Sequence, residues 1–367
     1  LVLLTAAGLV TRTFLRVTSI QTGFEPDRLV EVELRLPESS YSEPRAAVFF
    51  EQLLTKVRGL PGVTSASFVH GSPFGRSYTF TTTDSAGNHS PPIDGVEAGA
   101  DYFRTIGATI REGRGIEAND RPGGENVVVI NEILARRLFP QGGAVGRTMQ
   151  LQGSTVRVIG IVKNVLQRQL EVQPSAVVYR SIAQEGIGRY VDLMVRTEGS
   201  PATLHPSIVR AVQSLDPSLP PPPIRLMADV VAREIAPRQF TFVLFGIFAA
   251  LAGALAVIGL YGVLANLVAD RAREIGIRVA LGADPRRVIR LILGQGAALA
   301  TIGVALGLAG SALSVRSART LLYGTSVYDP WAFAGGATLL VFVSLVAAYL
   351  PARRASQVDP VIALRAE

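Results

Sequence analysis

Three long uncharged segments occupy the last third of the chain. Residues 239–269, 291–315 and 331–350 contain no Asp, Glu, Lys or Arg. Each matches or exceeds the roughly 20 residues that a helix needs to cross a bilayer core of about 30 Å. The pattern therefore predicts a bundle of three transmembrane helices, over about 240–268, 291–315 and 331–350.

Glycine recurs along all three predicted spans. Small residues let membrane helices approach one another closely, so we interpret these positions as packing surfaces rather than as a pore lining. They are Gly246, Gly253, Gly259, Gly262, Gly303, Gly307, Gly310, Gly335 and Gly336. The spans contain no ionisable side chain except tyrosine, which indicates no proton relay.

Between residues 27 and 237 the periodicity is that of a mixed α/β domain. Residues 29–36 alternate apolar and polar positions, as a half-buried strand does. Residues 43–60 carry the apolar stripe of an amphipathic helix, formed by Ala47, Phe50, Leu53, Leu54 and Val57. A second strand over 61–70 would complete a β-α-β unit.

Short elements follow along the rest of this domain. The pattern predicts strands over 78–83, 95–98, 148–153, 154–165, 176–179 and 190–196, a strand entering a helix over 126–140, and a helix over 202–215. The proline run 219–223 predicts a stiff, extended linker. Residues 227–238 read as a short helix that leads into the first span.

The chain opens on ten mostly apolar residues, with no initiating methionine and no preceding basic segment. A secretory signal peptide would carry a charged region before its apolar stretch and a small-residue cleavage site after it. We therefore expect residues 1–16 to be the end of a transmembrane helix whose beginning lies further upstream.

A basic connector, residues 270–290, joins the first two predicted spans. Short basic loops are retained on the cytoplasmic side of a membrane, and this one holds Arg271, Arg273, Arg278, Arg286, Arg287 and Arg290. Its residue order predicts a lateral helix over 272–281 with Gly282 as C-cap, then a new helix with Asp284 at the N-cap and Pro285 at its first position. Counting spans from this loop places the C-terminus in the cytoplasm and the large domain outside.

At the connector the sequence resembles a known family. Residues 273–296, REIGIRVALGADPRRVIRLILGQG, are similar to the signature loop of FtsX/MacB-type permeases, the mechanotransmitting ABC transporters. Residues 327–333, VYDPWAF, and 350–367, LPARRASQVDPVIALRAE, resemble that family's last periplasmic loop and C-terminal tail. The whole chain looks most like the C-terminal half of the large duplicated orphan permeases of Acidobacteria.

The resemblance implies an α+β membrane protein with a mixed α/β periplasmic domain on a transmembrane helical bundle. Residues 17–238 would form a MacB-like periplasmic core domain of two lobes, a porter-like portion and an inserted lobe. Residues 239–367 would form an FtsX-like permease domain. The protein would be a multi-pass protein of the bacterial inner membrane, in contact with membrane lipid and forming a homodimer, or a pseudo-dimer with a duplicated half.

In the resembled family a short cytoplasmic coupling helix docks on a separate nucleotide-binding subunit. Carried over to this chain, the partner-binding residues would be Arg273, Glu274, Ile275, Gly276, Ile277, Arg278, Leu281, Gly282 and Ala283. The alternative for the apolar members is anchorage in the membrane interface. The implied partner is a cytoplasmic ABC ATPase subunit that is not part of this chain.

The motifs that enzymes need are missing from the sequence. A phosphate-binding loop of the Walker type ends in a lysine that follows its glycines, and Lys56 and Lys163, the two lysines of the chain, lack that context. His70, His89 and His205 show no metal-ligand spacing. The net charge of +7 comes almost wholly from arginine without interleaved aromatics, which does not indicate nucleic-acid binding. We therefore expect no catalytic residue, no cofactor and no metal site.

Three functions remain open. The first is a permease that couples ATP hydrolysis by a separate subunit to movement of a periplasmic domain, for efflux or extraction of an amphipathic substrate. The second is a signalling mechanotransmitter that acts on an envelope partner such as a cell-wall hydrolase and moves no substrate. The third is a membrane-anchored binding module without an ATPase. The sizeable external domain favours the first, and a co-purifying nucleotide-binding subunit would exclude the third.

Overall fold

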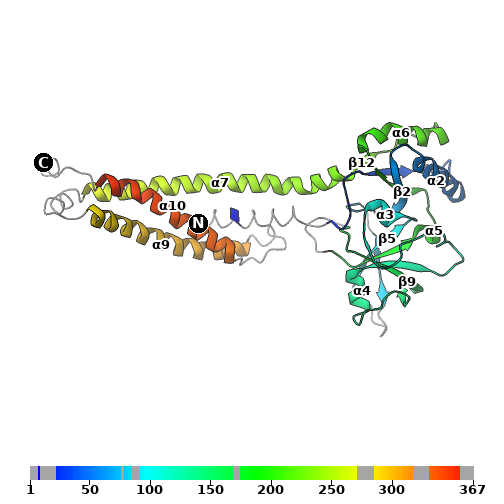
Figure 1. Cartoon of the computed structure of the whole chain (residues 1–367), viewed down its shortest axis with the longest axis horizontal. Coiled ribbons are helices and arrows are strands. Elements are labelled where there is room, and N and C mark those ends of the chain that lie inside the picture. Colours follow the sequence, from blue (N-terminus) through cyan, green and yellow to red (C-terminus); the bar gives the residue numbers. More distant parts are fainter. Residues whose placement is uncertain are drawn as a thin grey trace. The chain divides into compact units, whose positions relative to one another are not determined.

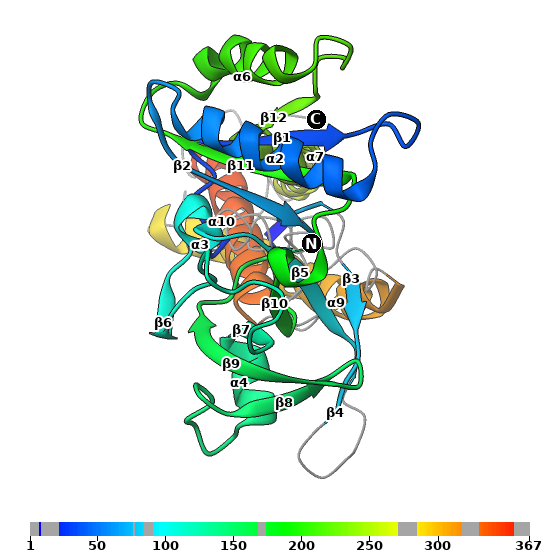
Figure 2. The same cartoon turned by 90° about the vertical axis from the view of Figure 1, so that its right-hand side faces the viewer.

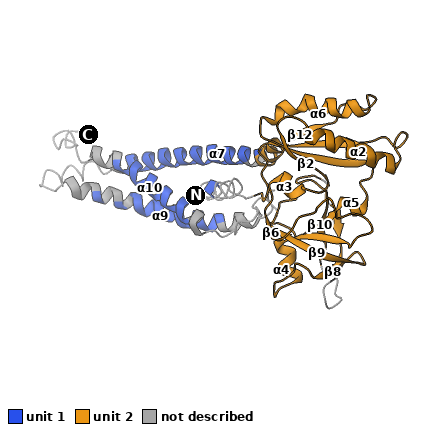
Figure 3. Cartoon of the chain, turned by 45° about the vertical axis from the view of Figure 1, so that its right-hand side comes forward, with its two compact units in different colours: residues 1–19, 236–367 blue, residues 20–235 orange. Residues whose placement is uncertain are grey.

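The computed structural model describes residues 7–8, 22–75, 78–83, 91–167, 174–270, 285–317 and 330–355. The chain divides into two compact units (Figure 3). Unit 1 comprises residues 1–19 and 236–367, and unit 2 comprises residues 20–235. Apart from residues 7–8, the predicted membrane-helix end at 1–16 lies outside the described residues.

Unit 2 is built on one mixed sheet of 12 strands. Its main path runs β12-β1-β11-β2-β5-β10-β7-β9-β8-β4, with β3 beside β5 and β6 beside β9. The strands are β1 (Leu29–Arg35), β2 (Val63–His70), β3 (Tyr78–Phe80), β4 (Thr82–Thr83), β5 (Ile93–Ala98), β6 (Ile110–Gly113), β7 (Val127–Asn131), β8 (Thr148–Leu151), β9 (Ser154–Val162), β10 (Val177–Ser181), β11 (Tyr190–Thr197) and β12 (Ile224–Leu226). The pairs β10·β5 and β7·β9 are parallel.

Helices connect many of these strands. They are α2 (Glu43–Arg58), α3 (Tyr102–Ile106), α4 (Glu132–Leu138), α5 (Ile182–Glu185), α6 (Pro201–Leu215) and the first turns of α7 (Met227–Asp270). The predicted stripe of α2 is confirmed at Phe50, Leu53 and Val57, which are buried. Ala46 and Phe49 form the rest of the buried face, so the apolar stripe is rotated about the helix axis from the predicted one.

The predicted β-α-β unit is present in a split form. β1, α2 and β2 follow one another along the chain, but β11 lies between the two strands and runs antiparallel to both. The register pairs Glu33 with Asp192 and Asp192 with Val69. Directly opposite residues of antiparallel strands point to the same face. These three side chains therefore lie on one face of the sheet.

The core of unit 2 falls into three clusters. The first packs α2 and α6 on one face of the sheet, around Phe50. The second lies on the other face around Tyr179 and includes Met227, the first residue of α7. The third packs α4 around Val158. Figure 2 shows α2 and α6 with β12 and β1 at one end of the unit and α4 with β8 at the other. Because one sheet path joins these ends, the two expected lobes belong to a single compact unit.

β1 is buried on both faces over residues 29–32, so the prediction of a half-buried strand is wrong there, whereas its polar positions Glu33 and Arg35 are half-buried and exposed, as predicted. Glu31, at a polar position of the alternation, is 1% exposed. The first core cluster covers one face of β1, and Leu29 joins the second cluster on the other. At Glu31 the polar side of the alternation therefore lies against a second core, and towards Arg35 it reaches solvent.

Several short elements escape the sequence pattern. α3, β6 and β12 contain 5, 4 and 3 residues, too few to show a period. The predicted short helix over 227–238 does not end where the first span begins. Instead α7 runs as one helix of 44 residues from Met227 to Asp270 (Figure 1).

Unit 1 contains the rest of α7 together with α9 (Pro285–Ser317) and α10 (Pro330–Ala355). Within the described residues one helical stretch, Met227–Leu267, is long and apolar enough to cross a membrane by length and composition. Shorter apolar stretches are Gly296–Ser311 and Ala334–Tyr349. Membrane spanning by α9 and α10 stays a prediction.

α9 approaches α10 and α7 closely at Gly296. A Cβ atom on this residue would lie 3.0 Å from the Cβ of Ala348 and 3.5 Å from the Cδ1 of Leu264. Both neighbours are fully buried. At six of the nine glycines that the sequence singled out, an added Cβ would meet nothing described within 4 Å: Gly246, Gly253, Gly259, Gly262, Gly303 and Gly335. The close approach at Gly296 therefore lies at a glycine that the sequence analysis did not name, and packing at Gly307, Gly310 and Gly336 stays a prediction.

Candidate functional site

The predicted coupling residues, 273–283, lie outside the described residues. α7 is described as far as Asp270, and α9 from Pro285 onward. Pro285 is the first described residue of α9, and its fixed φ is compatible with the helix that follows. The predicted N-cap, Asp284, lies outside the described residues. The roles of the residues between these two helices stay predictions.

The membrane-type stretch of α7 presents large apolar side chains on its surface. Phe240, Leu255 and Ile258 are 70%, 70% and 66% exposed. Contiguous apolar surface of this kind is uncommon on water-soluble proteins and marks a membrane or protein interface. Its chemistry suits lipid hydrocarbon.

A buried ionic group lies in unit 2, where β12 leads into α7. Glu31 of β1 is directly opposite Arg225 of β12. The Nη2 atom of Arg225 lies 3.0 Å from Glu31 Oε2 and 3.0 Å from Glu33 Oε1, and its Nε donates to Glu31 Oε2 at 3.1 Å. The Glu31 side chain is 2% exposed and that of Arg225 41%. A carboxylate this deeply buried needs a charged or hydrogen-bonding partner, and Arg225 provides both.

Two further groups complete the surroundings of Glu31. The hydroxyl of Ser72 donates to Glu31 Oε1, so both carboxylate oxygens accept hydrogen bonds. Asp192 of β11 is 3% exposed, lies opposite Glu33 and accepts from the Tyr190 hydroxyl at 3.2 Å. Three carboxyl groups thus share one face of the sheet, and Arg225 contacts two of them.

His70, at the end of β2, lies beside this group. Its Nδ1 is 2.8 Å from Glu97 Oε2, and its Nε2 donates to the carbonyl oxygen of Tyr190. Carbonyl and carboxylate oxygens only accept, and only the imidazolium form of histidine donates from both nitrogens. Burial lowers the pKa of His70, but the hydrogen bonds to Glu97 and Tyr190 outweigh it and the net shift is upward.

For the two most deeply buried carboxyl groups, Glu31 and Asp192, burial raises the pKa instead of lowering it. It raises the pKa of Glu31, and the neighbouring Asp192 and Glu33 charges raise it further, which outweighs the opposing effects of Ser72 and Arg225. Burial also raises the pKa of Asp192, against the hydrogen bond from Tyr190. Desolvation penalises the charged form of a carboxyl group. The cluster is therefore poised to take up protons more readily than exposed carboxylates.

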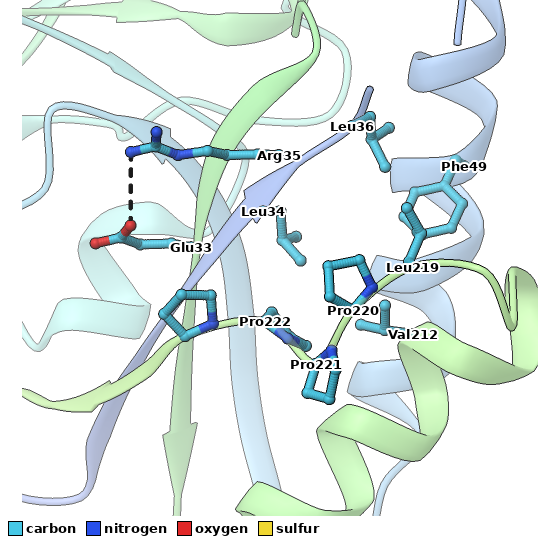
Figure 4. A pocket seen from close by; sticks show the side chains of 11 residues that line it. Glu33, Leu34, Arg35, Leu36, Phe49, Val212, Leu219, Pro220, Pro221 and Pro222 are labelled. Atoms are coloured by element: carbon cyan, nitrogen blue, oxygen red, sulfur yellow. Dashed lines mark ion pairs between the residues drawn. The ribbon is translucent and has the colours of Figure 1, made fainter. Parts of the chain in front are cut away.

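The proline run flanks the same strands. Residues 219–223 lie over β1, and with Phe49 of α2 and Val212 of α6 they line a mostly apolar pocket of about 200 Å³ (Figure 4). At its side, Arg35 pairs with Glu33 at 3.7 Å. The amide of Glu33 donates to the carbonyl oxygen of Pro223 at 3.0 Å. The stiff run therefore ends where β12 begins and fixes that strand beside β1.

This arrangement holds charged side chains in place, and its serine has no general base that could activate it as a nucleophile. Ser72 donates to Glu31, whereas His70 bonds to Glu97 and Tyr190, so the hydroxyl has no histidine base. Within the described ranges, no group of three or more His, Asp or Glu side chains could hold a metal ion. The sequence reasoning missed the cluster. The sequence feature that could have revealed the cluster is an acidic residue between apolar neighbours in a strand, which occurs twice in LVEVELR and once in YVDLMVR.

Two family models match the chain. The MacB-like periplasmic core domain matches residues 2–210, and the FtsX-like permease C-terminal domain matches residues 246–360. The first covers more than half of the chain.

Curated relatives agree with these matches. The ABC transporter permease YvrN of Bacillus subtilis strain 168 is 26% identical over 348 residues, which covers 90% of this chain and 82% of that protein. The macrolide export ATP-binding/permease protein MacB of Wolinella succinogenes is 27% identical over 257 residues, 66% of this chain and 38% of that protein. The chain therefore spans well under half of the MacB relative. The periplasmic region of MacB from Actinobacillus actinomycetemcomitans matches with a TM-score of 0.42 at 14% identity, over 60% of this chain and 98% of that one.

Proposed function

This chain belongs to the ABC transporter permeases of the FtsX/MacB type, and from that membership we propose that it couples ATP hydrolysis by a separate cytoplasmic subunit to movement of its periplasmic domain. Such permeases are inner-membrane proteins with a periplasmic domain, and they are transporter components rather than enzymes. The proposed task is efflux or extraction of an amphipathic substrate. The relative whose name states macrolide export supports it.

The proposed topology assigns residues 17–238 to the periplasmic core domain and 239–367 to the permease domain. In the proposed periplasmic core domain, the porter-like portion and the inserted lobe are built on one continuous sheet. α7, α9 and α10 each cross the membrane, the C-terminus is cytoplasmic, and the protein pairs with a second copy or a duplicated half. The uncharged segments and the basic connector between the first two spans support this assignment.

The observation that carries the coupling proposal is the continuity of α7. Met227, its first residue, is fully buried in the core of unit 2 and directly follows β12. The same helix includes the membrane-type stretch and reaches Asp270, next to the connector. A helix of 44 residues is about 66 Å long. Because each turn is held by backbone hydrogen bonds, displacement of one end is transmitted to the other.

The ATPase of this proposal is a separate subunit. Lys56 lies in the last turn of α2 and Lys163 directly follows β9, so neither lysine follows a glycine-rich loop at the start of a helix. In this proposal the subunit docks on residues 273–283 of the connector. The purified chain should show no ATPase activity, and turnover abolished by Lys56→Ala or Lys163→Ala would contradict this.

Ile277→Pro tests the coupling. An interior proline costs a helix about 3 kcal/mol, whereas the spans and the arginines that orient them are unchanged. We expect normal membrane level but lost stimulation of the ATPase that co-purifies with the full chain from its native membrane. Replacing Arg286 and Arg287 by lysine keeps the charge and should be silent. Normal stimulation by Ile277→Pro, or the absence of any co-purifying ATPase, would overturn the proposal.

Transport is tested separately in proteoliposomes. ATP-driven movement of a fluorescent amphipathic probe would support efflux. Stimulated ATP hydrolysis without any probe movement would favour the signalling function, in which the periplasmic domain acts on an envelope partner.

A further inference from the structure

The joint between the sheet and α7 is a short edge strand. β12 has 3 residues and pairs with β1 on one side as the last strand of the main path. Its last residue, Leu226, is followed immediately by Met227 of α7. An edge strand this short contributes few backbone hydrogen bonds, so side-chain contacts have a large share in holding it.

The side-chain contacts of this joint are concentrated at Arg225. Its guanidinium group bonds to Glu31 twice and to Glu33 once, all from the neighbouring strand. Hydrogen bonds between ionised partners are roughly twice as strong as neutral ones. Met227 supplies the apolar anchor next to this contact. The ionic and the apolar contacts lie on consecutive elements, and Val230 and Val231 pack against the same cluster as Met227, so ionic and apolar contacts hold the first turn of α7 together.

Negative charge exceeds positive charge around Arg225. The ionisable groups that interact with Glu31 are Glu33 of β1, Asp192 of β11, Tyr102 of α3 and Arg225 of β12. One step further out, Arg35 pairs with Glu33 and His70 acts on Asp192. Asp192 and Glu33 both disfavour ionisation of Glu31. Burial adds to this, and the pKa of Glu31 is raised. A proton can therefore reach this carboxyl group at milder acidity than an exposed glutamate requires.

Protonation of Glu31 would change its two bonds unequally. Ser72 donates to Oε1 as a hydroxyl, and a hydroxyl can turn to accept when the carboxyl carries the proton. Arg225 cannot accept, because a guanidinium has donors only. The bond to Ser72 therefore survives protonation, and the bond to Arg225 loses its charge assistance.

We propose that Glu31, Glu33 and Arg225 form a proton-sensitive clasp that fixes β12 and the first turn of α7 to the sheet. With Glu31 ionised the clasp is closed and α7 moves with unit 2. In the loosened joint Glu31 stays buried beside Ser72 but has lost Arg225, whose positive charge lowers the pKa of Glu31. The neutral form of Glu31 therefore favours this state, and Arg225 keeps Glu33 as its charged partner. The inference rests on the proposed function in one respect, that α7 is the helix through which motion passes.

Hydrogen exchange of the full chain in lipid nanodiscs tests the clasp. Amide protection in residues 224–232 is compared at about pH 7.5 and about pH 5, after correction for the intrinsic exchange rate. We expect wild-type protection to fall by about five- to tenfold at the lower pH, the ratio that a difference of about 1–1.4 kcal/mol produces. Glu31→Gln, a neutral isostere, should show the lowered protection at both pH values.

Two variants keep the test decisive. Arg225→Gln removes the cation at a partly exposed side chain and should also lower protection at both pH values. Glu38→Gln removes an exposed carboxylate that pairs with Arg189, and should behave as wild type. Unchanged protection in α2 shows that each variant is folded. Wild-type protection that does not vary with pH, or normal protection in both Glu31→Gln and Arg225→Gln, would overturn the clasp.

The clasp and the proposed function fail separately. Exchange reports the joint without an ATPase, whereas stimulation of the co-purified ATPase reports coupling. Lowered exchange protection in Glu31→Gln with normal stimulation would keep the clasp and remove its part in coupling. Lost stimulation in Ile277→Pro with a pH-sensitive joint would support both.

Discussion

Substitution of Gly296 by leucine should destabilise the helices of unit 1, and the same change at Gly303 should not. Both residues lie on α9, so the two variants share helix, residue type and added volume. At Gly296 the first added carbon lies 3.0 Å from Ala348 Cβ and 3.5 Å from Leu264 Cδ1, whereas at Gly303 it meets nothing described within 4 Å. Only the first variant has to displace a neighbour.

The size of the difference follows from these contacts. Carbon atoms pack best at about 3.5–4.0 Å, so a side chain at Gly296 forces α9 away from α10. Overpacking of this kind costs about 1–3 kcal/mol. Replacing glycine by leucine inside a helix recovers up to about 0.5–1 kcal/mol in backbone conformational entropy. Gly303→Leu should therefore be neutral or slightly stabilising, and Gly296→Leu should be less stable than Gly303→Leu by about 2 kcal/mol.

Unfolding in mixed micelles with increasing SDS, followed by far-UV circular dichroism, measures this difference. Gly296→Ala provides an intermediate, because its single methyl group meets Ala348 at the tight but not impossible distance of 3.0 Å. We expect the order of stability Gly303→Leu, Gly296→Ala, Gly296→Leu. Equal loss at both glycines, or full stability of Gly296→Leu, would refute the contact among α9, α10 and α7.

Two further predictions concern unit 2 and the topology. Burial raises the pKa values of Glu31 and Asp192, so at neutral pH the native state carries a desolvation cost, which disappears as pH falls through these pKa values towards the ordinary 4.5 and 3.8. The pKa of His70 is also raised, so His70 contributes stability that is present below pH 6.5 and is lost as pH rises through its folded pKa. Acidification from about pH 7 to about pH 5 should therefore raise the thermal midpoint of unit 2, and the rise should shrink in a variant carrying Glu31→Gln and Asp192→Asn; a midpoint that falls in wild type would contradict the burial argument. A cysteine at Val48, which is 54% exposed, should react with an impermeant maleimide from outside the inner membrane, and one at the exposed Arg290 should react only after that membrane is opened; equal labelling in intact spheroplasts would contradict the topology.

Local pattern was enough for most elements of the fold. The alternation over LVEVELR and the stripe of α2 depend on neighbours within a few residues, so they survive in the sequence as periods. The helix described from Pro285 onward was equally local, because its apolar run and the proline at its described beginning lie within the same segment. The connector residues were recognised by resemblance, and their part in coupling remains a proposal.

The buried acid cluster could not be found in this way. Glu31 and Arg225 are separated by 194 positions along the chain, and they meet only because β12 pairs with one edge of β1 while β11 enters between β1 and β2. The same alternation that predicts a strand cannot say whether its polar face meets water or a second core. The sequence by itself determined the longer strands and helices and the uncharged segments through contacts between near neighbours. Only the tertiary structure decided that Glu31 is buried, that Arg225 is its partner and that α7 continues unbroken from this joint, because each depends on surfaces supplied by distant parts of the chain.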